Sequence, residues 1–315
     1  MLYRLGNTPS LDKKQIATKK KLACSCDGAG RNVEQKTQRT KEIDTDHQVM
    51  RLSNNSYKTK LRRGGFATVH SAIWSDGPIE KWNIKPKQWY RRTNELVALK
   101  YADNSKVEVD YFLKEVESYF QITDNSAFIR CLGISQHPDG RYIIVLEFAV
   151  LGSLRSYLDE NYKSLTWKDK ITALFNISMG LSTLHKSQLI HHDFHSGNLL
   201  FIRDVGGKFL NISDLGQCKR DGQNELNAVI GILPYIAPEV LHKKKCSKAA
   251  DIYSFAIVAY EILTGLRPHA DVEHDYNFAI EIMKGLRPKI PKNTPKLLAK
   301  LIMECWMLDQ IKDIR

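Results

Sequence analysis

Residues 189–200 of this chain read LIHHDFHSGNLL, and residues 214–216 read DLG. The first stretch places Asp193 and Asn198 five positions apart, on what we expect to be a loop between a helix and a strand. Sixteen residues after Asn198, Asp214 adds a second carboxylate. A carboxylate that can accept a hydroxyl proton, followed by an amide and a carboxylate that can hold Mg²⁺, is the set of groups that phosphoryl transfer requires.

The bulk composition is that of a soluble protein with a substantial core. The chain has 315 residues, of which 43% are hydrophobic and 26% charged, so one large or two small domains are expected. The longest apolar run, 252–266, is interrupted by polar residues and too short to span a bilayer. We also see no secretory signal. The six cysteines are scattered, apart from Cys24 and Cys26, which favours a reducing compartment and a cytoplasmic location.

The first sixty residues are strongly basic. They hold 13 Lys or Arg against 6 Asp or Glu, in a chain whose net charge is +12. Such an arm could bind nucleic acid, an acidic partner or an anionic membrane surface. Because aromatic residues are almost absent there, we favour a solvated, disordered leader over residues 1–55 and no specific nucleic-acid partner. The run Lys19–Lys21 could act as a nuclear import signal, which makes the nucleus a second location.

The spacing of apolar residues divides the remainder into a strand-rich first part and a helix-rich second part. Strands are predicted at 66–74, 95–101, 128–134 and 141–148, and helices at 109–121, 154–161, 167–187, 248–264, 276–284 and 295–307. This order predicts an α+β fold with two lobes, a small β-rich N-lobe and a larger α-helical C-lobe, and a ligand-binding cleft between them.

A polar insert, residues 75–94, separates the first two predicted strands. It is long for a hairpin connection. It carries two prolines and the cluster WYRR at 89–92. No chemical role follows from these residues, and an exposed recognition loop is the interpretation that we keep.

Two features of the strand-rich part could bind phosphates. Gly64 and Gly65 lie in a bend between strands, where glycine lets backbone amides approach phosphate oxygens without a Cβ in the way; a plain hairpin turn is the alternative. Lys100 ends an apolar strand and could hold phosphate oxygens, although an exposed edge lysine would look the same. Glu115, on the following helix, is spaced to form an ion pair with Lys100, which favours the phosphate-binding interpretation.

Three further motifs complete the pattern: GILPYIAPE at 231–239, DIYSF at 251–255, and CW at 305–306. All of these segments occur in the order and spacing of a eukaryotic protein kinase. The chain resembles the tyrosine-kinase-like group and, more narrowly, the expanded kinase families of arbuscular mycorrhizal fungi. The resemblance implies a kinase domain at 56–315, with an N-lobe at about 56–149 and a C-lobe at about 150–315.

The resemblance also implies an activity and a set of site residues. A protein kinase transfers the γ-phosphate of ATP, with Mg²⁺, to hydroxyl groups of a protein substrate in signalling. By this resemblance Asp193 would accept the hydroxyl proton, Lys100 held by Glu115 would position the nucleotide, and Asn198 and Asp214 would bind Mg²⁺. The residues implied to bind the nucleotide are Gly64, Gly65, Val69, Ala98, Lys100, Glu147, Ala149, Leu200 and Asp214, with Leu146 behind the adenine. Val69, Ala98 and Leu200 would sandwich the adenine, and the backbone of 147–149 would meet its edge.

Five departures from the family pattern bear on activity. Arg62 and Ala67 replace two glycines of the phosphate loop. His192 replaces the arginine that precedes the catalytic aspartate and, in relatives, grips a phosphorylated activation segment. His195 and Ile232 stand at positions that normally help to distinguish Ser/Thr kinases from Tyr kinases. The GxxxYxAPE form of residues 231–239 still favours Ser/Thr. The chain also ends before the last helix of its relatives, so we expect an incomplete C-lobe with exposed apolar surface.

The segment from residue 217 to residue 234 holds no Ser, Thr or Tyr. This agrees with the loss of the arginine at His192, because a loop without an acceptor needs no residue to bind its phosphate. We hypothesise that phosphorylation of this segment does not switch the activity.

Two other functions stay open. The HxDxHxGN pattern at 191–198 also resembles small-molecule phosphotransferases, but these lack the GILPYIAPE segment. A pseudokinase that serves as a binding scaffold is the stronger alternative, favoured by Arg62 and His192. The presence of Lys100, Glu115, Asp193, Asn198 and Asp214 opposes it. The sequence does not indicate an oligomeric state.

Overall fold

The computed structural model describes residues 57–63, 68–85, 88–102, 106–122, 126–204, 207–222, 229, 231–243 and 246–307. The predictions for the leader and for Gly64 and Gly65 lie outside these residues. The described chain forms two units: the first holds residues up to Phe120 and Arg130–Phe148, and the second holds Gln121–Ile129 and the residues from Ala149 onward. Among the described helices, none is long and apolar enough to cross a membrane.

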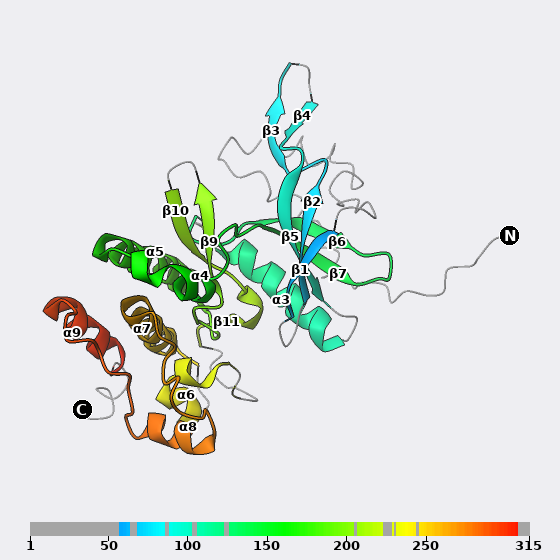
Figure 1. Ribbon diagram of the computed structural model, residues 1–315. Coiled ribbons are helices and arrows are strands. Elements are labelled where there is room, and N and C mark those ends of the chain that lie inside the picture. Colours follow the sequence, from blue (N-terminus) through cyan, green and yellow to red (C-terminus); the bar gives the residue numbers. More distant parts are fainter. Residues whose placement is uncertain are drawn as a thin grey trace. The chain divides into compact units, whose positions relative to one another are not determined.

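The first unit is built on an antiparallel sheet of five strands in the order β1-β2-β5-β7-β6 (Figure 1). Its strands are β1 (Tyr57–Arg63), β2 (Thr68–Trp74), β5 (Glu95–Ala102), β6 (Cys131–Gln136) and β7 (Tyr142–Glu147), and its helix is α3 (Lys106–Gln121). In β5, Val97, Leu99 and Tyr101 are buried in an apolar cluster. Because successive side chains in a strand alternate, Ala98 and Lys100 share the opposite face.

The insert at 75–94 is a correction to the sequence analysis, which expected a loop. It contains a two-stranded ribbon of β3 (Ile79–Asn83) and β4 (Gln88–Arg91), shown at the top of Figure 1. Trp82 and Trp89 lie opposite each other in this ribbon, and their rings meet edge-on. The polar composition of the segment concealed this cross-strand pair, which stabilises an otherwise short ribbon.

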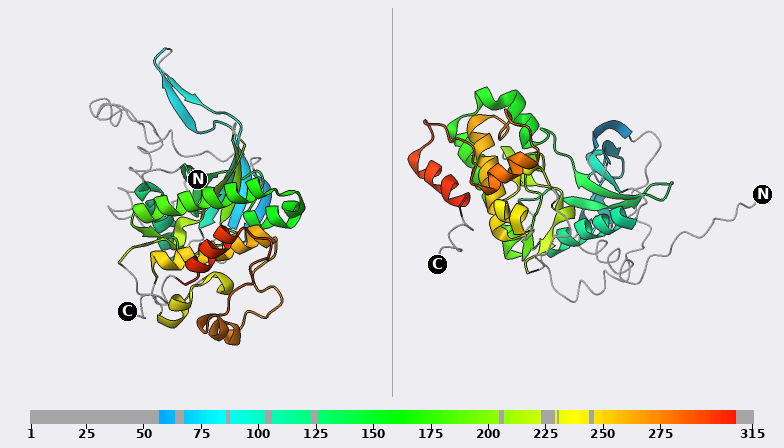
Figure 2. Two further views of the ribbon diagram at one scale, coloured as in Figure 1. Left: turned by 90° about the vertical axis from the view of Figure 1, so that its left-hand side faces the viewer. Right: turned by 90° about the horizontal axis from the view of Figure 1, so that it is seen from below.

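The second unit is mostly helical (Figure 2). Its helices are α4 (Leu154–Asn161), α5 (Trp167–Lys186), α6 (Pro238–Lys243), α7 (Lys248–Thr264), α8 (Tyr276–Met283) and α9 (Lys296–Cys305), and its strands are β8 (Leu189–Ile190), β9 (Leu199–Asp204), β10 (Gly207–Ile212) and β11 (Lys219–Arg220). The predictions for α4 and α7 are confirmed to the residue, and those for α5, α8 and α9 to within two residues at each end. The sequence analysis missed the short helix α6 and the strands β8, β10 and β11.

Local signals in the sequence explain these boundaries. Thr166 and Asp169 form a reciprocal capping box at the start of α5, which satisfies two otherwise unpaired amides. Helix α7 ends at Gly265, whose φ of 74° lies in the left-handed region. A Cβ at Gly265 would stand 2.5 Å from the ring of Tyr162, so both backbone angle and close packing require glycine there.

Helix α7 forms the centre of the second unit, and α5 and α9 both pack against it (Figure 2). Ile257, Val258 and Ala259 on consecutive positions are fully buried, as expected for a helix that is apolar all round. Apolar side chains of α5 and α9 also line a groove of about 820 Å³.

The predicted strand 128–134 begins three residues late, at Cys131. Phe128 instead bridges Ile212 at the end of β10, and the Ile129 N–H donates to the Ile212 carbonyl at 2.9 Å. These bonds attach residues 121–129 to the second unit.

Candidate active site

In the first unit, Lys100 on β5 and Glu115 on α3 form the ion pair that their spacing predicts. The distance from Lys100 Nζ to Glu115 Oε2 is 2.7 Å, and the side chains are only 14% and 4% exposed. Taking two charges out of water is costly unless they are well paired. A pair so placed fixes the ammonium group on one face of the sheet.

The residues predicted to contact adenine share that face. Val69 lies directly opposite Lys100 in the β2–β5 register, and Ala98 lies opposite Leu146 in the β5–β7 register. Directly opposed residues in an antiparallel pair project to the same side. The sheet therefore groups Val69, Ala98, Lys100 and Leu146 on one surface of the first unit.

Residues 147–149, which are predicted to meet the adenine edge, already use some of their backbone groups in hydrogen bonds within the protein. The Glu147 N–H donates to the Arg130 carbonyl at 2.9 Å, and the Ala149 carbonyl accepts from Gly152 N–H at 3.0 Å. The Glu147 carboxylate receives two bonds from the Arg130 guanidinium, each 3.0 Å long.

In the second unit, Asp251 in the first turn of α7 anchors the loop at 191–198. One of its carboxylate oxygens accepts from His191 N–H at 2.8 Å and the other from His192 N–H at 3.0 Å. The same carboxylate lies 2.8 Å from His185 Nε2. Asp251 is 2% exposed. A buried carboxylate that accepts several charge-assisted bonds holds the loop backbone rigidly.

The His191 ring links this loop to the residue before Asp214. Its Nδ1 accepts from Asp193 N–H at 3.3 Å. The proton of the neutral ring is then on Nε2, which donates to the Ser213 carbonyl at 3.1 Å. The fully buried His191 thus sets the position of both Asp193 and the turn that carries Asp214.

The side chains of Asp193 and Asn198 are hydrogen-bonded to each other. Asn198 Nδ2 donates to the Asp193 carbonyl at 3.0 Å and to Asp193 Oδ2 at 3.2 Å. The Asp193 side chain is 22% exposed, whereas Asn198 is 3% exposed. Since both bonds use the amide nitrogen, Asn198 Oδ1 is oriented away from Asp193 and can serve as an oxygen ligand.

Asn198 and Asp214 are connected through Ser213. The Ser213 N–H and hydroxyl both donate to the Asn198 carbonyl, at 2.9 and 2.8 Å. Asp214 follows with φ 58° and ψ 68°, a left-handed conformation that costs a non-glycine residue free energy and recurs at functional sites. An amide oxygen and a carboxylate are the oxygen donors that Mg²⁺ prefers together with phosphates, so the donor set fits that ion.

His195 is buried beside Asp193. It is 5% exposed, and its Nδ1 accepts from Gly197 N–H at 3.0 Å. The neutral ring therefore carries its proton on Nε2, which lies 3.8 Å from Asp193 Oδ2. This position places the N–H donor of a neutral ring on the side of the Asp193 carboxylate.

His192 stands at the position of the family arginine, and its imidazole ring is uncharged at neutral pH. Burial, reinforced by the nearby Lys219, lowers its pKa below the ordinary value. Within the described residues, neither ring nitrogen has a hydrogen-bond partner. Its φ of 68° is also left-handed. The ring is thus neither charged nor arranged to bind a phosphate.

A buried network that the sequence analysis missed fixes the segment after residue 231. The Tyr235 hydroxyl donates to Glu261 Oε1 at 2.7 Å, and Arg155 donates to Glu261 Oε2 at 2.6 Å. Ser196, in the 191–198 loop, lies 3.4 Å from the Tyr235 hydroxyl. Burial raises the pKa of Glu261, although its bonds to Tyr235, Ser196 and Arg155 oppose the shift. No spacing signal links these residues, because Arg155 and Glu261 are 106 positions apart.

Comparison with known proteins agrees with this geometry. Residues 56–312 match the family described as "Protein tyrosine and serine/threonine kinase". A probable serine/threonine-protein kinase of Dictyostelium discoideum is 30% identical over 87% of this chain and 20% of its own length. An RGS domain-containing serine/threonine-protein kinase of the same organism is 28% identical over 76% of this chain and 21% of its own length. A serine/threonine-protein kinase of Arabidopsis thaliana is 32% identical over 85% of this chain and 49% of its own length.

This chain therefore spans less than half the length of each of these relatives. The family match covers most of the chain, and the predicted two-part α+β kinase fold is confirmed. The chain belongs to the protein tyrosine and serine/threonine kinase family.

Proposed function

We propose that this chain transfers the γ-phosphate of ATP to Ser or Thr hydroxyls of a protein substrate. The observation that carries the proposal is the fixed pair of Asp193 and Asn198, joined by bonds of 3.0 and 3.2 Å in a loop anchored to Asp251. This arrangement suits a carboxylate that must meet a hydroxyl group in one orientation. The three relatives are all named serine/threonine-protein kinases, which supports the choice of residue.

In this mechanism Asp193 accepts the hydroxyl proton while Asn198 and the loop backbone hold its carboxylate in place. Lys100, neutralised on one side by Glu115, binds phosphate oxygens. Bound at Asn198 and Asp214, Mg²⁺ would neutralise charge on the phosphates. His195 Nε2 lies 3.8 Å from Asp193 Oδ2, and we propose that this distance shortens when substrate binds, so that the Nε2 proton orients the carboxylate.

The finer assignments are part of the same proposal. We place the chain in the tyrosine-kinase-like group, and more narrowly with the expanded kinase families of arbuscular mycorrhizal fungi. The order and spacing of its motifs resemble those of these kinases. The nucleotide-binding roles of Val69, Ala98, Glu147, Ala149 and Leu200 follow from the same resemblance. The cytoplasm or the nucleus is the proposed location, and a protein substrate is the proposed partner.

We further infer that phosphorylation between residues 217 and 234 does not control the activity. The segment has no hydroxyl side chain, and the neutral, partly buried His192 lacks the charged, two-donor group with which an arginine binds a phosphate. Phosphatase treatment of the purified chain should leave the rate unchanged. A large loss would assign control to a phosphorylated residue outside this segment.

The function is tested by transfer of radiolabelled phosphate from ATP with Mg²⁺ to a generic basic protein. We expect Asp193→Ala to lower kcat by about 10²- to 10⁴-fold, because a positioned general base contributes that much. Asp271→Ala, which removes an exposed carboxylate of the same unit, is the matched control and should change little. Hydrolysis of the labelled protein then identifies the phosphorylated amino acid.

Two outcomes would contradict the proposal. Folded protein that binds ATP without transferring phosphate would point to a scaffold. Labelled phosphotyrosine would overturn the assignment to Ser or Thr.

A further inference from the structure

The β3–β4 ribbon stands apart from the rest of the described first unit. Each of its strands pairs only with the other among the described residues, so neither outer edge is paired with another described strand. Its base is firmly closed: Arg92 N–H donates to the Pro78 carbonyl at 3.1 Å, and Asn94 N–H donates to the Ser75 carbonyl at 3.0 Å. The Arg91 guanidinium also donates to the Gly77 carbonyl at 2.8 Å. The two ends of the insert are therefore held together where they meet β2 and β5.

Gly77 makes that closure possible. Its φ is 69°, and a Cβ there would stand 1.7 Å from the Arg92 carbonyl oxygen. Only glycine allows the two ends of the insert to approach so closely.

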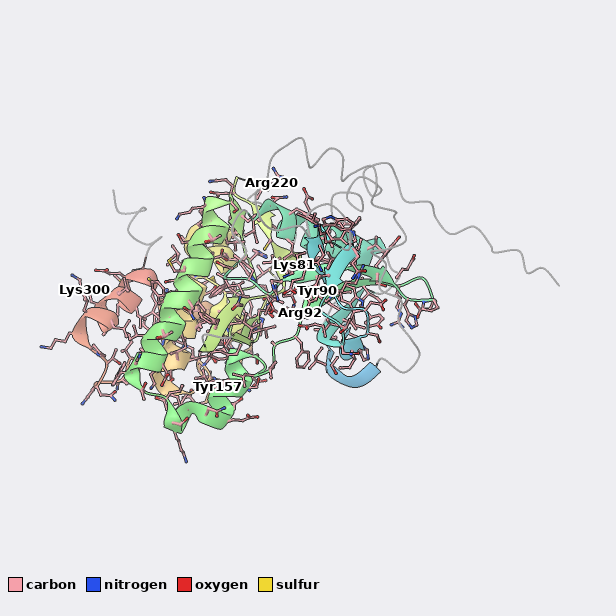
Figure 3. All side chains as sticks on the ribbon, turned by 90° about the horizontal axis from the view of Figure 1, so that it is seen from above. Lys81, Tyr90, Arg92, Tyr157, Arg220 and Lys300 are labelled. Atoms are coloured by element: carbon pink, nitrogen blue, oxygen red, sulfur yellow. The ribbon has the colours of Figure 1, made fainter. Side chains whose placement is uncertain are left out.

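Contacts between side chains hold the ribbon in shape on both faces. On one face, the rings of Trp82 and Trp89 meet edge-on with centroids 4.9 Å apart. On the other, the Lys81 ammonium lies 5.4 Å from the centre of the Tyr90 ring. Figure 3 labels Lys81, Tyr90 and Arg92 on this segment. Such pairs give a short ribbon the rigidity that two strands alone do not supply.

The ribbon exposes aromatic, aliphatic and cationic groups together. Ile84 is 77% exposed, Tyr90 47% and Trp82 36%, and Lys81 and Lys85 are exposed beside them. The insert 75–94 holds 5 Lys or Arg against 2 Asp or Glu. Exposed aromatic side chains at the centre of a polar surface are typical of binding sites. Nothing in the proposed phosphoryl transfer uses them.

We propose that the β3–β4 ribbon is a docking arm for an acidic, extended peptide segment of a partner protein. Acidic side chains complement Lys81 and Lys85, and apolar side chains between them would cover Trp82 and Ile84. An extended peptide can also pair its backbone with an open edge of the ribbon, as in strand addition. Charge, apolar surface and backbone groups are then satisfied by one ligand.

Two other ligands fit the same surface less well. A lipid bilayer cannot hydrogen-bond the open strand edges, whose burial without partners is costly. Single-stranded nucleic acid requires open ring faces for stacking, but Trp82 meets the ring of Trp89 and Tyr90 lies under the Lys81 ammonium.

This docking does not depend on the proposed function, because binding requires no phosphoryl transfer. The test selects binders to the intact 315-residue chain from a random peptide library. A parallel selection uses Lys81→Glu/Lys85→Glu, and peptides that this variant also binds are removed. We expect the remaining peptides to be rich in Asp and Glu with apolar residues between them.

One selected peptide is then synthesised and its affinity measured. It should bind the double variant about tenfold more weakly than the wild type, since two attractions become repulsions, and high salt should weaken wild-type binding. The matched control is Lys289→Glu/Lys292→Glu, which changes charge equally at exposed positions of the second unit. Asp193→Ala should bind like wild type. Near-ultraviolet circular dichroism of the tryptophan pair checks that the ribbon stays intact.

The proposal is overturned if the selected peptides carry no excess of acidic residues, or if the double variant binds them unchanged. It is also overturned if phosphatidylserine vesicles or single-stranded DNA bind more tightly than the peptide and lose that binding in the same variant.

Discussion

The loop at 191–198 and the β3–β4 ribbon achieve a fixed conformation in opposite ways. In the loop, His191, His195 and Asn198 are at least 95% buried, and each makes hydrogen bonds to the loop or to its neighbours. In the ribbon, Trp82, Ile84 and Tyr90 are at least 36% exposed, and two ring contacts hold the strands together.

The difference shows how burial constrains each region. A buried polar group without a partner costs free energy, so the loop is stable in few arrangements and its carboxylates are oriented. The side chains of an exposed ribbon need no such partners, because water can hydrogen-bond them. Residues on its surface can therefore be chosen for binding a ligand at little cost to the fold. The loop therefore suits chemistry and the ribbon suits recognition.

The largest effect expected in this comparison is that of Asp251→Ala. This change removes the acceptors of the His191 and His192 amides and of the His185 ring. Leaving buried donors without partners should lower the free energy of unfolding by about 3 kcal/mol. Urea denaturation of the wild type and of Asp251→Ala measures this difference in the free energy of unfolding.

Asp251→Asn is the matched variant, because its single carbonyl oxygen keeps part of the bonding. It should lose less stability than Asp251→Ala. Equal losses in the two variants would show that the loop does not depend on these hydrogen bonds.

The next effect concerns which nitrogen of His195 matters. In His195→Asn the side-chain oxygen can still accept from Gly197 N–H, but the donor that faces Asp193 is lost. Hydrogen bonds to charged groups contribute about 1.5 to 3 kcal/mol, so we expect kcat to fall about ten- to hundredfold with little change in KM.

His195→Gln is the conservative counterpart, because its amide nitrogen can occupy the place of Nε2 and restore the donor. Recovery of kcat in this variant would support orientation of Asp193 by His195. A similar loss in both variants would show that the ring serves only to pack the loop. The Nε2 to Asp193 distance of 3.8 Å exceeds a hydrogen bond, and such contacts often shorten when substrate binds.

Regular elements and local pairs were the predictable part of this molecule. The apolar runs of 154–161 and 248–264 gave α4 and α7 to the residue, and the interval between Lys100 and Glu115 gave their ion pair. The helices follow from the period of their apolar residues, whereas the ion pair follows from the spacing of these two residues in the kinase pattern. The roles of the predicted site residues remain predictions.

What the sequence could not predict depends on specific pairs of side chains. Neither Arg155 nor Glu261 carries a local signal that the two are paired. The ribbon at 79–91 was hidden because its stability comes from Trp82 facing Trp89, a contact that a polar average conceals. Both misses have the same cause: tertiary contacts, not propensity, decided the structure.

The third effect is a pH dependence from His192, in the loop. Its pKa in the folded chain is lowered by burial, whereas in the unfolded chain it is near the ordinary 6.5. Above that value neither state holds the proton. Below it the unfolded state binds the proton first, so stability must fall as the pH falls, by at most about 1.4 kcal/mol per pH unit.

His192→Asn tests this directly, because asparagine tolerates the left-handed backbone and does not titrate. Urea unfolding from about pH 7.5 to about pH 5.5 should show a smaller loss of stability in the variant. An identical slope in both proteins would mean that the His192 ring gains access to water and titrates normally.

The smallest effect on global stability is expected from Trp89→Ala in the ribbon. The pair with Trp82 contributes about 0.5 to 1.5 kcal/mol to the ribbon, but the ribbon can open locally without unfolding the sheet. Amide hydrogen exchange at 79–91 should accelerate, while the urea midpoint stays nearly unchanged. Trp74→Ala is the contrasting variant: Trp74 is 7% exposed in the β2 core, and its loss should cost about 3 to 5 kcal/mol globally. A global loss of that size in Trp89→Ala would make the ribbon a supporting part of the sheet, and its freedom to serve recognition would disappear.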